Sequence, residues 1–185
     1  MSRVPDVPES ERTPDQRRIA AEIAGTRGGV VRGPFAIWLR LPDIADHANQ
    51  FGSALRLKGT LDRRLFELMV LIIARHWNAQ YEWFAHAHQA LTEGVEPAVI
   101  TAIQNNRVPE FHRDDERAIY ELVDELNTTK VVSPQTYDRS LQRFGLETLI
   151  EIITAAGFYT MVAMMLNAFD APVPDGSRPL PDGAK

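Results

Sequence analysis

The sequence predicts an all-α protein, and three observations support this prediction. Apolar residues recur at helical spacing along most of the chain, as they do over residues 118–126. Five of the 12 prolines lie between such segments, where a proline marks the first turn of a helix. No stretch alternates apolar and polar residues over the length of a strand, and Val30-Val31 is the only weak candidate. The predicted helices cover residues 15–25, 43–57, 61–76, 79–93, 97–105, 115–127, 134–144 and 147–169.

Local signals place the ends of several of these helices. Ser133 precedes Pro134 and is expected to cap the helix that follows. Glycines at 94 and 145 are expected to end helices in a left-handed conformation. Asp114 or Asp115 is expected to cap the helix that follows them.

Length and composition indicate one domain with two tails. The chain has 185 residues, and seven of its 12 prolines lie in the terminal segments. We expect an N-terminal tail with a short helix over 1–33, a helical domain over 34–170, and an extended tail over 171–185. Either tail can be extended or mobile, and the second can also pack on a neighbouring subunit.

Charge and cysteine content exclude several classes of function. The net charge of −5 does not suit nucleic-acid binding, which requires a basic patch. The longest apolar run, 68–74, is far shorter than the ~20 residues of a membrane span. We therefore expect neither nucleic acid nor membrane as a partner. The first twelve residues lack the apolar core of a secretory signal, so we expect a cytoplasmic protein. With no cysteine, the chain cannot use a thiol in catalysis.

Two predicted helices are apolar on nearly every side, which indicates contact between subunits. One lies within 61–76 and the other within 147–169. A helix with no polar face must be covered all round, and a chain of this size covers one such helix well. Covering two predicts a homo-oligomer. The alternative is one central helix and one half-buried, Met-rich helix within a single chain.

Glu67 is the first candidate for chemistry, because it lies on the apolar stripe of the predicted helix 61–76. A carboxylate in such a place is either desolvated, with a raised pKa, or paired with a cation. Arg63 and Arg64 lie one turn earlier and offer an ordinary structural ion pair. The residues alone leave both possibilities open.

The next helix brings a carboxylate and a histidine to one face. Glu82 and His86 are four residues apart and can form a hydrogen bond, and Asn78 is a candidate cap for this helix. His88 points about 200° away from His86 around the helix, so the two histidines cannot chelate one metal ion. We therefore expect no metal site. A histidine beside Trp83 can equally be a core residue.

These residues resemble a known family. Tyr81-Glu82-Trp83, then His86, Ala90 and Gly94, all preceded by Glu67-Leu68, is similar to the carboxymuconolactone decarboxylase family of the alkylhydroperoxidase D-like superfamily. The resemblance covers about residues 34–174. It implies an all-α alkylhydroperoxidase D-like bundle that assembles as trimers or hexamers.

The resemblance also implies an activity. The thiol branch of the superfamily has two cysteines whose positions correspond to Ala79 and Glu82, so this chain would keep the proton relay without sulfur. The implied reaction is decarboxylation of a small carboxylated lactone or a related aromatic-catabolism intermediate, without a cofactor. His86 would be the acid/base, with Glu67 and Glu82 as its partners. The alternative is a non-catalytic oligomeric binding or scaffold protein with the same fold.

The substrate-binding residues follow from the needs of that chemistry. A carboxylated substrate requires a cation, and Arg56 and Arg75 rank first among the arginines that lie in apolar segments. Each can equally be a structural or solvated arginine. Aromatic residues close to the motif are candidates for the pocket wall, although such residues are usually core. They are Tyr81, Trp83, Trp77 and Tyr159.

Overall fold

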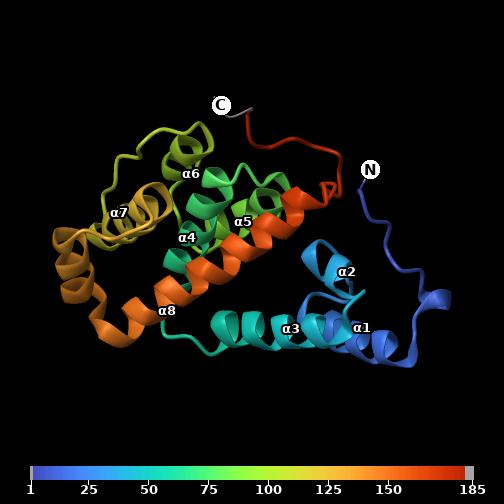
Figure 1. Ribbon diagram of the computed structural model, residues 1–185. Coiled ribbons are helices and arrows are strands. Elements are labelled where there is room, and N and C mark those ends of the chain that lie inside the picture. The colour runs from blue at the N-terminus through green and yellow to red at the C-terminus, as the bar shows by residue number, and fades with distance from the viewer. Residues whose placement is uncertain (1, 182–185) are drawn as a thin grey trace. The chain divides into compact units, whose positions relative to one another are not determined.

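The computed structural model describes residues 2–181, and all its regular elements are helical (Figure 1). The all-α prediction is confirmed, and Val30-Val31 is not a strand. A short 3-10 helix, η1 (Glu9–Glu11), precedes eight α-helices in the described part of the chain. They are α1 (Pro14–Thr26), α2 (Pro34–Trp38), α3 (Pro42–Leu57), α4 (Arg63–His76), α5 (Gln80–Thr92), α6 (Pro97–Gln104), α7 (Asp114–Thr129) and α8 (Pro134–Ala168).

Most of the predicted helix boundaries are confirmed. Proline occupies the first turn of α1, α2, α3, α6 and α8. The Ser133 hydroxyl accepts the Thr136 backbone N–H at 3.3 Å, as an N-cap does. Gly94, with φ of 94°, follows α5, and Gly145, with φ of 75°, interrupts α8 between the two helices predicted there. The five-residue helix α2 was not predicted.

Two predicted caps are wrong. The helix α7 begins at Asp114, so both aspartates lie in its first turn, and its N-cap Arg113 forms no side-chain cap. The Asp115 carboxylate accepts Arg64 at 2.7 Å. Asn78 does not cap α5, whose N-cap is Ala79. Asn78 adopts a positive φ of 49° in the tight turn between α4 and α5, and its side-chain oxygen accepts Arg75 at 2.9 Å.

The chain forms two compact units by its internal contacts. The first comprises described residues 2–59 and 165–172, and the second comprises 60–164 and 173–181. In the first unit, α3 packs against α1 and α2, and the Asn49 side chain accepts hydrogen bonds from Thr26 and Arg27. The domain boundaries predicted at 33/34 and 170/171 stay a prediction. The extreme ends of the predicted tails, residue 1 and residues 182–185, lie outside the described residues.

The second unit is built around α4. This helix packs against α5, α6 and α7, and every residue from Arg64 to Arg75 is buried, as its all-round apolar sequence predicts. The later part of α8 also contacts α4, since the Tyr159 ring packs edge-on against Phe66 at 5.5 Å. Three of the residues buried along α4, Arg64, Glu67 and Arg75, are charged and therefore require partners.

Arg64 joins α4 to α7 through two carboxylates. Its guanidinium donates to Glu116 at 2.5 Å and to Asp115 at 2.7 Å. Glu116 is 1% exposed, so its charge has lost almost all contact with water. Burial alone would raise the pKa of Asp115, but the hydrogen bond and charge of Arg64 lower it overall. The carboxylate therefore stays ionised, and the three side chains clamp α4 and α7 together.

The C-terminal segment, residues 173–181, contains no helix and is held along its end by the second unit. The Gln80 amide pairs with both backbone groups of Leu180, at 3.0 and 2.9 Å. Gln104 donates to the Pro179 carbonyl at 2.7 Å. Leu180 is 1% exposed, so its side chain completes the packing of this unit.

The helix α8 is also long and apolar enough to pass for a membrane span by length and composition. Half of the apolar window is buried inside the structure. This is weak evidence for a span, because the core helix of a water-soluble protein has the same composition.

Replacing Arg64 tests the clamp. In Arg64→Ala the buried Glu116 carboxylate loses its cation, so we expect the free energy of unfolding to fall by about 3–5 kcal/mol. Urea denaturation measures it. Arg18→Ala is the control, because that arginine forms an exposed pair with Glu22, worth about 0.2–1 kcal/mol. Equal losses in the two variants would contradict a structural role for the clamp.

Candidate active site

The site begins with Glu67, a carboxylate that is completely buried in α4. One oxygen, Oε1, lies 2.5 Å from an Arg63 guanidinium nitrogen one turn earlier. The other, Oε2, lies 2.6 Å from Nδ1 of His86 on α5. The ion pair that the sequence offered as the structural alternative therefore exists. It coexists with the contact to the predicted catalytic histidine, so the carboxylate bridges both.

This geometry fixes the orientation of the His86 ring. Because Oε2 of the arginine-paired carboxylate can only accept, Nδ1 of His86 donates its proton to Glu67. The opposite nitrogen, Nε2, then carries the lone pair in the neutral ring and a proton in the charged ring. The His86 side chain is 12% exposed, so the group is largely but not wholly shielded from water.

Aromatic side chains hold the imidazole from the α8 side. The ring of Tyr159 meets that of His86 edge-on, with centroids 5.3 Å apart and an angle of 89°. Tyr159 also packs edge-on against Phe66 and Phe158, each at 5.5 Å. Tyr159 was predicted as a pocket wall, and the structure places it against His86. The two phenylalanines were not singled out, because nothing but their helical spacing distinguishes them from other core residues.

Glu82 does not join this group by a hydrogen bond. It is 1% exposed, and neither carboxyl oxygen has a hydrogen-bond partner among the described residues. The expected hydrogen bond with His86 is therefore wrong, although both residues lie on one face of α5. His86 instead directs Nδ1 to Glu67 on α4. Burial raises the pKa of the Glu82 carboxyl well above its ordinary value, which favours a neutral carboxylic acid at this position.

The two arginines ranked first for carboxylate binding lie in different places. Arg75 donates to the side chain of Asn78 at 2.9 Å and to the carbonyl of Pro181 at 3.3 Å. It therefore serves the turn after α4 and the C-terminal segment. Arg56 lies in the last turn of α3, in the first unit. The cation in contact with Glu67 is Arg63, and its spacing of four residues was the signal for it.

The other three aromatic residues predicted to line the pocket lie in α5 or at the end of α4. Trp83 is 2% exposed and belongs to the core. Tyr81 is buried in the first turn of α5. Trp77 ends α4, and its ring meets that of His76 edge-on at 6.4 Å. Their assignment to a substrate pocket stays a prediction. Within the described residues, no group of three His, Asp or Glu side chains could hold a metal ion.

Solved structures of other proteins share the fold of this chain. No protein-family model matches the chain, and neither does any curated protein. A solved structure of an alkylhydroperoxidase AhpD core, an uncharacterized peroxidase-related protein from Ralstonia eutropha JMP134, is 17% identical, with a TM-score of 0.75 and 98% of each chain covered. The chain thus has the AhpD-like helical fold.

A second group of similar structures comes from the debrominase Bmp8. The apo structure is 14% identical, with a TM-score of 0.71 over 94% of this chain and 92% of that chain. A cysteine-to-alanine variant in complex with 2,3,4-tribromopyrrole is 15% identical, with the same TM-score, over 94% and 91% of the two chains. At these identities the likeness shows the fold alone.

The buried acid predicts a pH dependence of stability. Because the folded-state pKa of Glu82 is raised, the folded chain keeps a proton that the unfolded chain has lost. This group therefore lowers stability as pH rises from the ordinary carboxyl pKa through the raised one, by about 1.4 kcal/mol for each unit of elevation. We expect Glu82→Gln to gain stability over the wild type as pH rises above the ordinary carboxyl pKa.

Chemical denaturation at several pH values measures this difference. Glu93→Gln is the matched control, because Glu93 ends the same helix in an exposed position. A difference between Glu82→Gln and the wild type that stays constant with pH would contradict a neutral buried acid.

Proposed function

We propose that this chain is a proton-transfer enzyme of the decarboxylase type, acting on a small carboxylated lactone or a related aromatic-catabolism intermediate. The observation that carries the proposal is the buried Glu67 carboxylate, shared between Arg63 and Nδ1 of His86. The AhpD-like fold is known in enzymes, since a debrominase has it. Decarboxylation and the substrate are inferred from the motif, and the proposed cytoplasmic location from the N-terminal sequence.

The proposed chemistry needs one group that moves a proton. When the substrate carboxylate leaves as carbon dioxide, the electron pair of the broken carbon–carbon bond delocalises into the lactone carbonyl. Nε2 of a protonated His86 then gives its proton to that carbon and is reprotonated by solvent. Glu67 holds the ring in the required tautomer and stabilises its charged form, as the carboxylate of a hydrolytic triad does.

Arg63 extends this arrangement by one step. A carboxylate buried as deeply as Glu67 is costly unless it is fully paired, and Arg63 supplies the second partner. The Arg63 side chain is 34% exposed, so it carries its charge at the edge of the buried pair. It acts through Glu67 and is a positioning residue. Glu82, a neutral acid one turn before His86, remains a candidate for the same chemistry.

The chain cannot perform the thiol chemistry of its superfamily. It contains no cysteine, so it has neither a thiolate nucleophile nor a resolving thiol. The structure of the debrominase variant shows that the fold, in that protein, accommodates a small substituted ring. A small ring compound is thus a reasonable size for a substrate here.

A non-catalytic oligomeric binding or scaffold protein is the second candidate. The Arg63–Glu67 pair favours it, because an i,i+4 ion pair is also a common structural feature of helices. Such a protein has no use for the orientation of His86, so variants at this histidine separate the two candidates.

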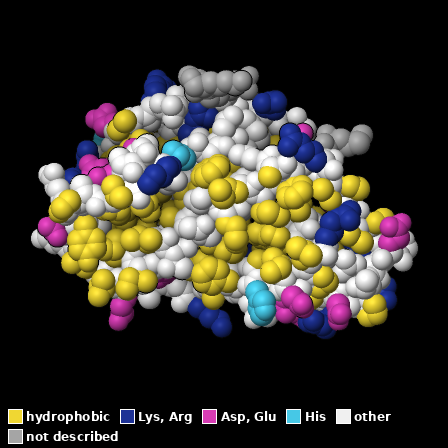
Figure 2. Space-filling view, viewed as in Figure 1, with side chains coloured by type: hydrophobic (Ala, Val, Ile, Leu, Met, Phe, Trp, Pro, Cys, Tyr) yellow, Lys and Arg dark blue, Asp and Glu magenta, His cyan; other side chains and the backbone are white. Residues whose placement is uncertain are grey.

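The proposed homo-oligomer has a suitable face on α8. Hydrophobic side chains gather over this helix in Figure 2. Five exposed, uncharged residues are spaced symmetrically along the helix, at 7 and 4 positions before Gly157, at Gly157 itself, and at 4 and 7 positions after it. No charged residue occurs between Glu151 and Asp170. A pattern symmetric about its centre suits two antiparallel copies of α8 related by a two-fold axis. The five are Ile150, Ile153, Gly157, Met161 and Met164.

Turnover of γ-carboxymuconolactone by purified variants tests the catalytic proposal. We expect His86→Ala to lower kcat by about 10²–10⁴-fold, because the proton donor is lost. Glu67→Gln should also lower kcat, since the ring loses its orientation. His88→Ala is the control, because His88 is exposed on the same helix. Full activity in a folded His86→Ala protein would remove this histidine from the mechanism.

Light scattering coupled to size-exclusion chromatography tests the oligomer. A charge at Ile153 or Met161 would be desolvated in the proposed contact, so Ile153→Glu and Met161→Glu should shift the mass toward one chain. Leu91→Glu is the control, as an exposed apolar residue on α5. An unchanged mass in all three variants would contradict an α8 interface.

A further inference from the structure

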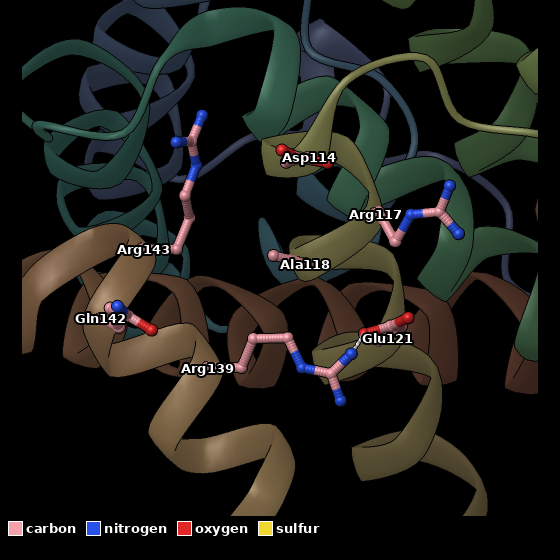
Figure 3. A pocket seen from close by; sticks show the side chains of 7 residues that line it. All are labelled: Asp114, Arg117, Ala118, Glu121, Arg139, Gln142 and Arg143. Carbon is pink, nitrogen blue, oxygen red and sulfur yellow. Dashed lines mark ion pairs between the residues drawn. The ribbon is translucent and has the colours of Figure 1, made fainter.

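A cavity lies between α7 and the first part of α8, within the second unit (Figure 3). It has a volume of about 440 Å³, which is in the range of small-molecule sites. The α7 wall has residues at helical spacing, starting at Asp114, and the α8 wall faces it with residues 139, 142 and 143. None of these residues belongs to the site around His86. We call this cavity the arginine groove, after Arg117, Arg139 and Arg143.

One of the three arginines is neutralised within the groove. Arg139 lies 2.6 Å from Glu121, and Figure 3 shows the two side chains meeting on one side. Near the other two cations, Arg117 and Arg143, lie the carboxylate of Asp114, which lines the groove, and that of Asp115, 3.8 Å from Arg143. The residues that line the groove are thus three cations and two carboxylates, in a chain whose total charge is −5.

Arg143 is the cation with the most unused hydrogen-bonding capacity. Its nearest carboxylate is that of Asp115, at 3.8 Å, which is too long for a hydrogen bond. Asp115 already accepts Arg64 at 2.7 Å. Arg117 makes one contact, donating to the Phe111 carbonyl at 3.1 Å. A guanidinium has five N–H donors, so both side chains can still grip an oxyanion.

We propose that the arginine groove binds a small oxyanion, a carboxylate or a phosphate, that also carries a hydroxyl group. Arg143 is the primary contact, with Arg117 adding charge and the Gln142 amide able to donate to an oxygen. The hydroxyl requirement comes from Asp114, which as a carboxylate accepts hydrogen bonds and repels a bare anion. The proposal does not depend on the reaction at His86.

A bound oxyanion would also lie near the Arg64–Asp115–Glu116 group that joins α4 to α7. Arg143 lies beside Asp115, and Asp115 holds Arg64 of α4. An anion bound to Arg143 competes with Asp115 for the Arg143 guanidinium. Binding of an oxyanion in the groove would thus weaken the contact between Arg143 of α8 and Asp115 of α7.

Calorimetric titration of the full chain at constant ionic strength tests the proposal. The probes are inorganic phosphate, malate and succinate, the last of which has no hydroxyl group. We expect saturable binding of phosphate or malate, and weaker binding of succinate. Whichever of the first two binds more tightly identifies the chemistry of the anion. No saturable binding of phosphate or malate, or tighter binding of succinate than of malate, would overturn the proposal.

Two variants locate the binding. Arg143→Gln should weaken it by about tenfold or more, because a charge-assisted hydrogen bond is lost. The Arg143 side chain is half exposed, so this variant is expected to fold. Arg18→Gln, at an exposed ion pair on α1, is the matched control. Unchanged affinity in Arg143→Gln, or an equal loss in the control, would overturn the site.

Discussion

The second unit depends on how the Glu67 carboxylate is kept inside an apolar helix. A charge with no access to water is tolerated only when its oxygens are paired. Arg63 pairs one oxygen from the preceding turn of α4, and His86 pairs the other from α5. The same contact therefore satisfies the buried charge, joins the two helices and aims the imidazole. Glu67 thus has both a structural role and the proposed chemical one.

The elements around this contact hold α4 and α5 in place. Arg64 fastens α4 to α7, and Asn78 turns the chain directly from α4 into α5. The C-terminal segment closes the far end, where Gln80 binds both backbone groups of Leu180. Each of these contacts uses a polar side chain next to a buried apolar surface. These contacts connect α4 and α5 to α7, to each other and to the C-terminal segment.

The fold was largely predictable from the sequence, because prolines, glycines and helical apolar spacing are local signals. The pairing of Glu67 with His86 followed only from a resemblance, since the two residues come from different helices and spacing within one helix cannot join them. The partner of Glu82 was predicted wrongly, because its spacing from His86 within α5 allows a hydrogen bond but does not show that Nδ1 of His86 contacts Glu67 on α4 instead. Two predicted caps are wrong because α7 begins at Asp114 and the N-cap of α5 is Ala79, while Asp115 and Asn78 accept hydrogen bonds from arginines. The arginine groove could not be predicted from the sequence, because its lining residues lie on two separate helices, α7 and α8.

The direct test of the central claim is the tautomer of His86, read from the nitrogen chemical shifts of its ring by nuclear magnetic resonance. We expect the neutral ring to carry its proton on Nδ1, donated to Glu67, and to leave the lone pair on Nε2. Glu67→Gln should disturb this preference, whereas His88→Ala should not. A neutral ring protonated on Nε2 in the wild-type chain would contradict the account.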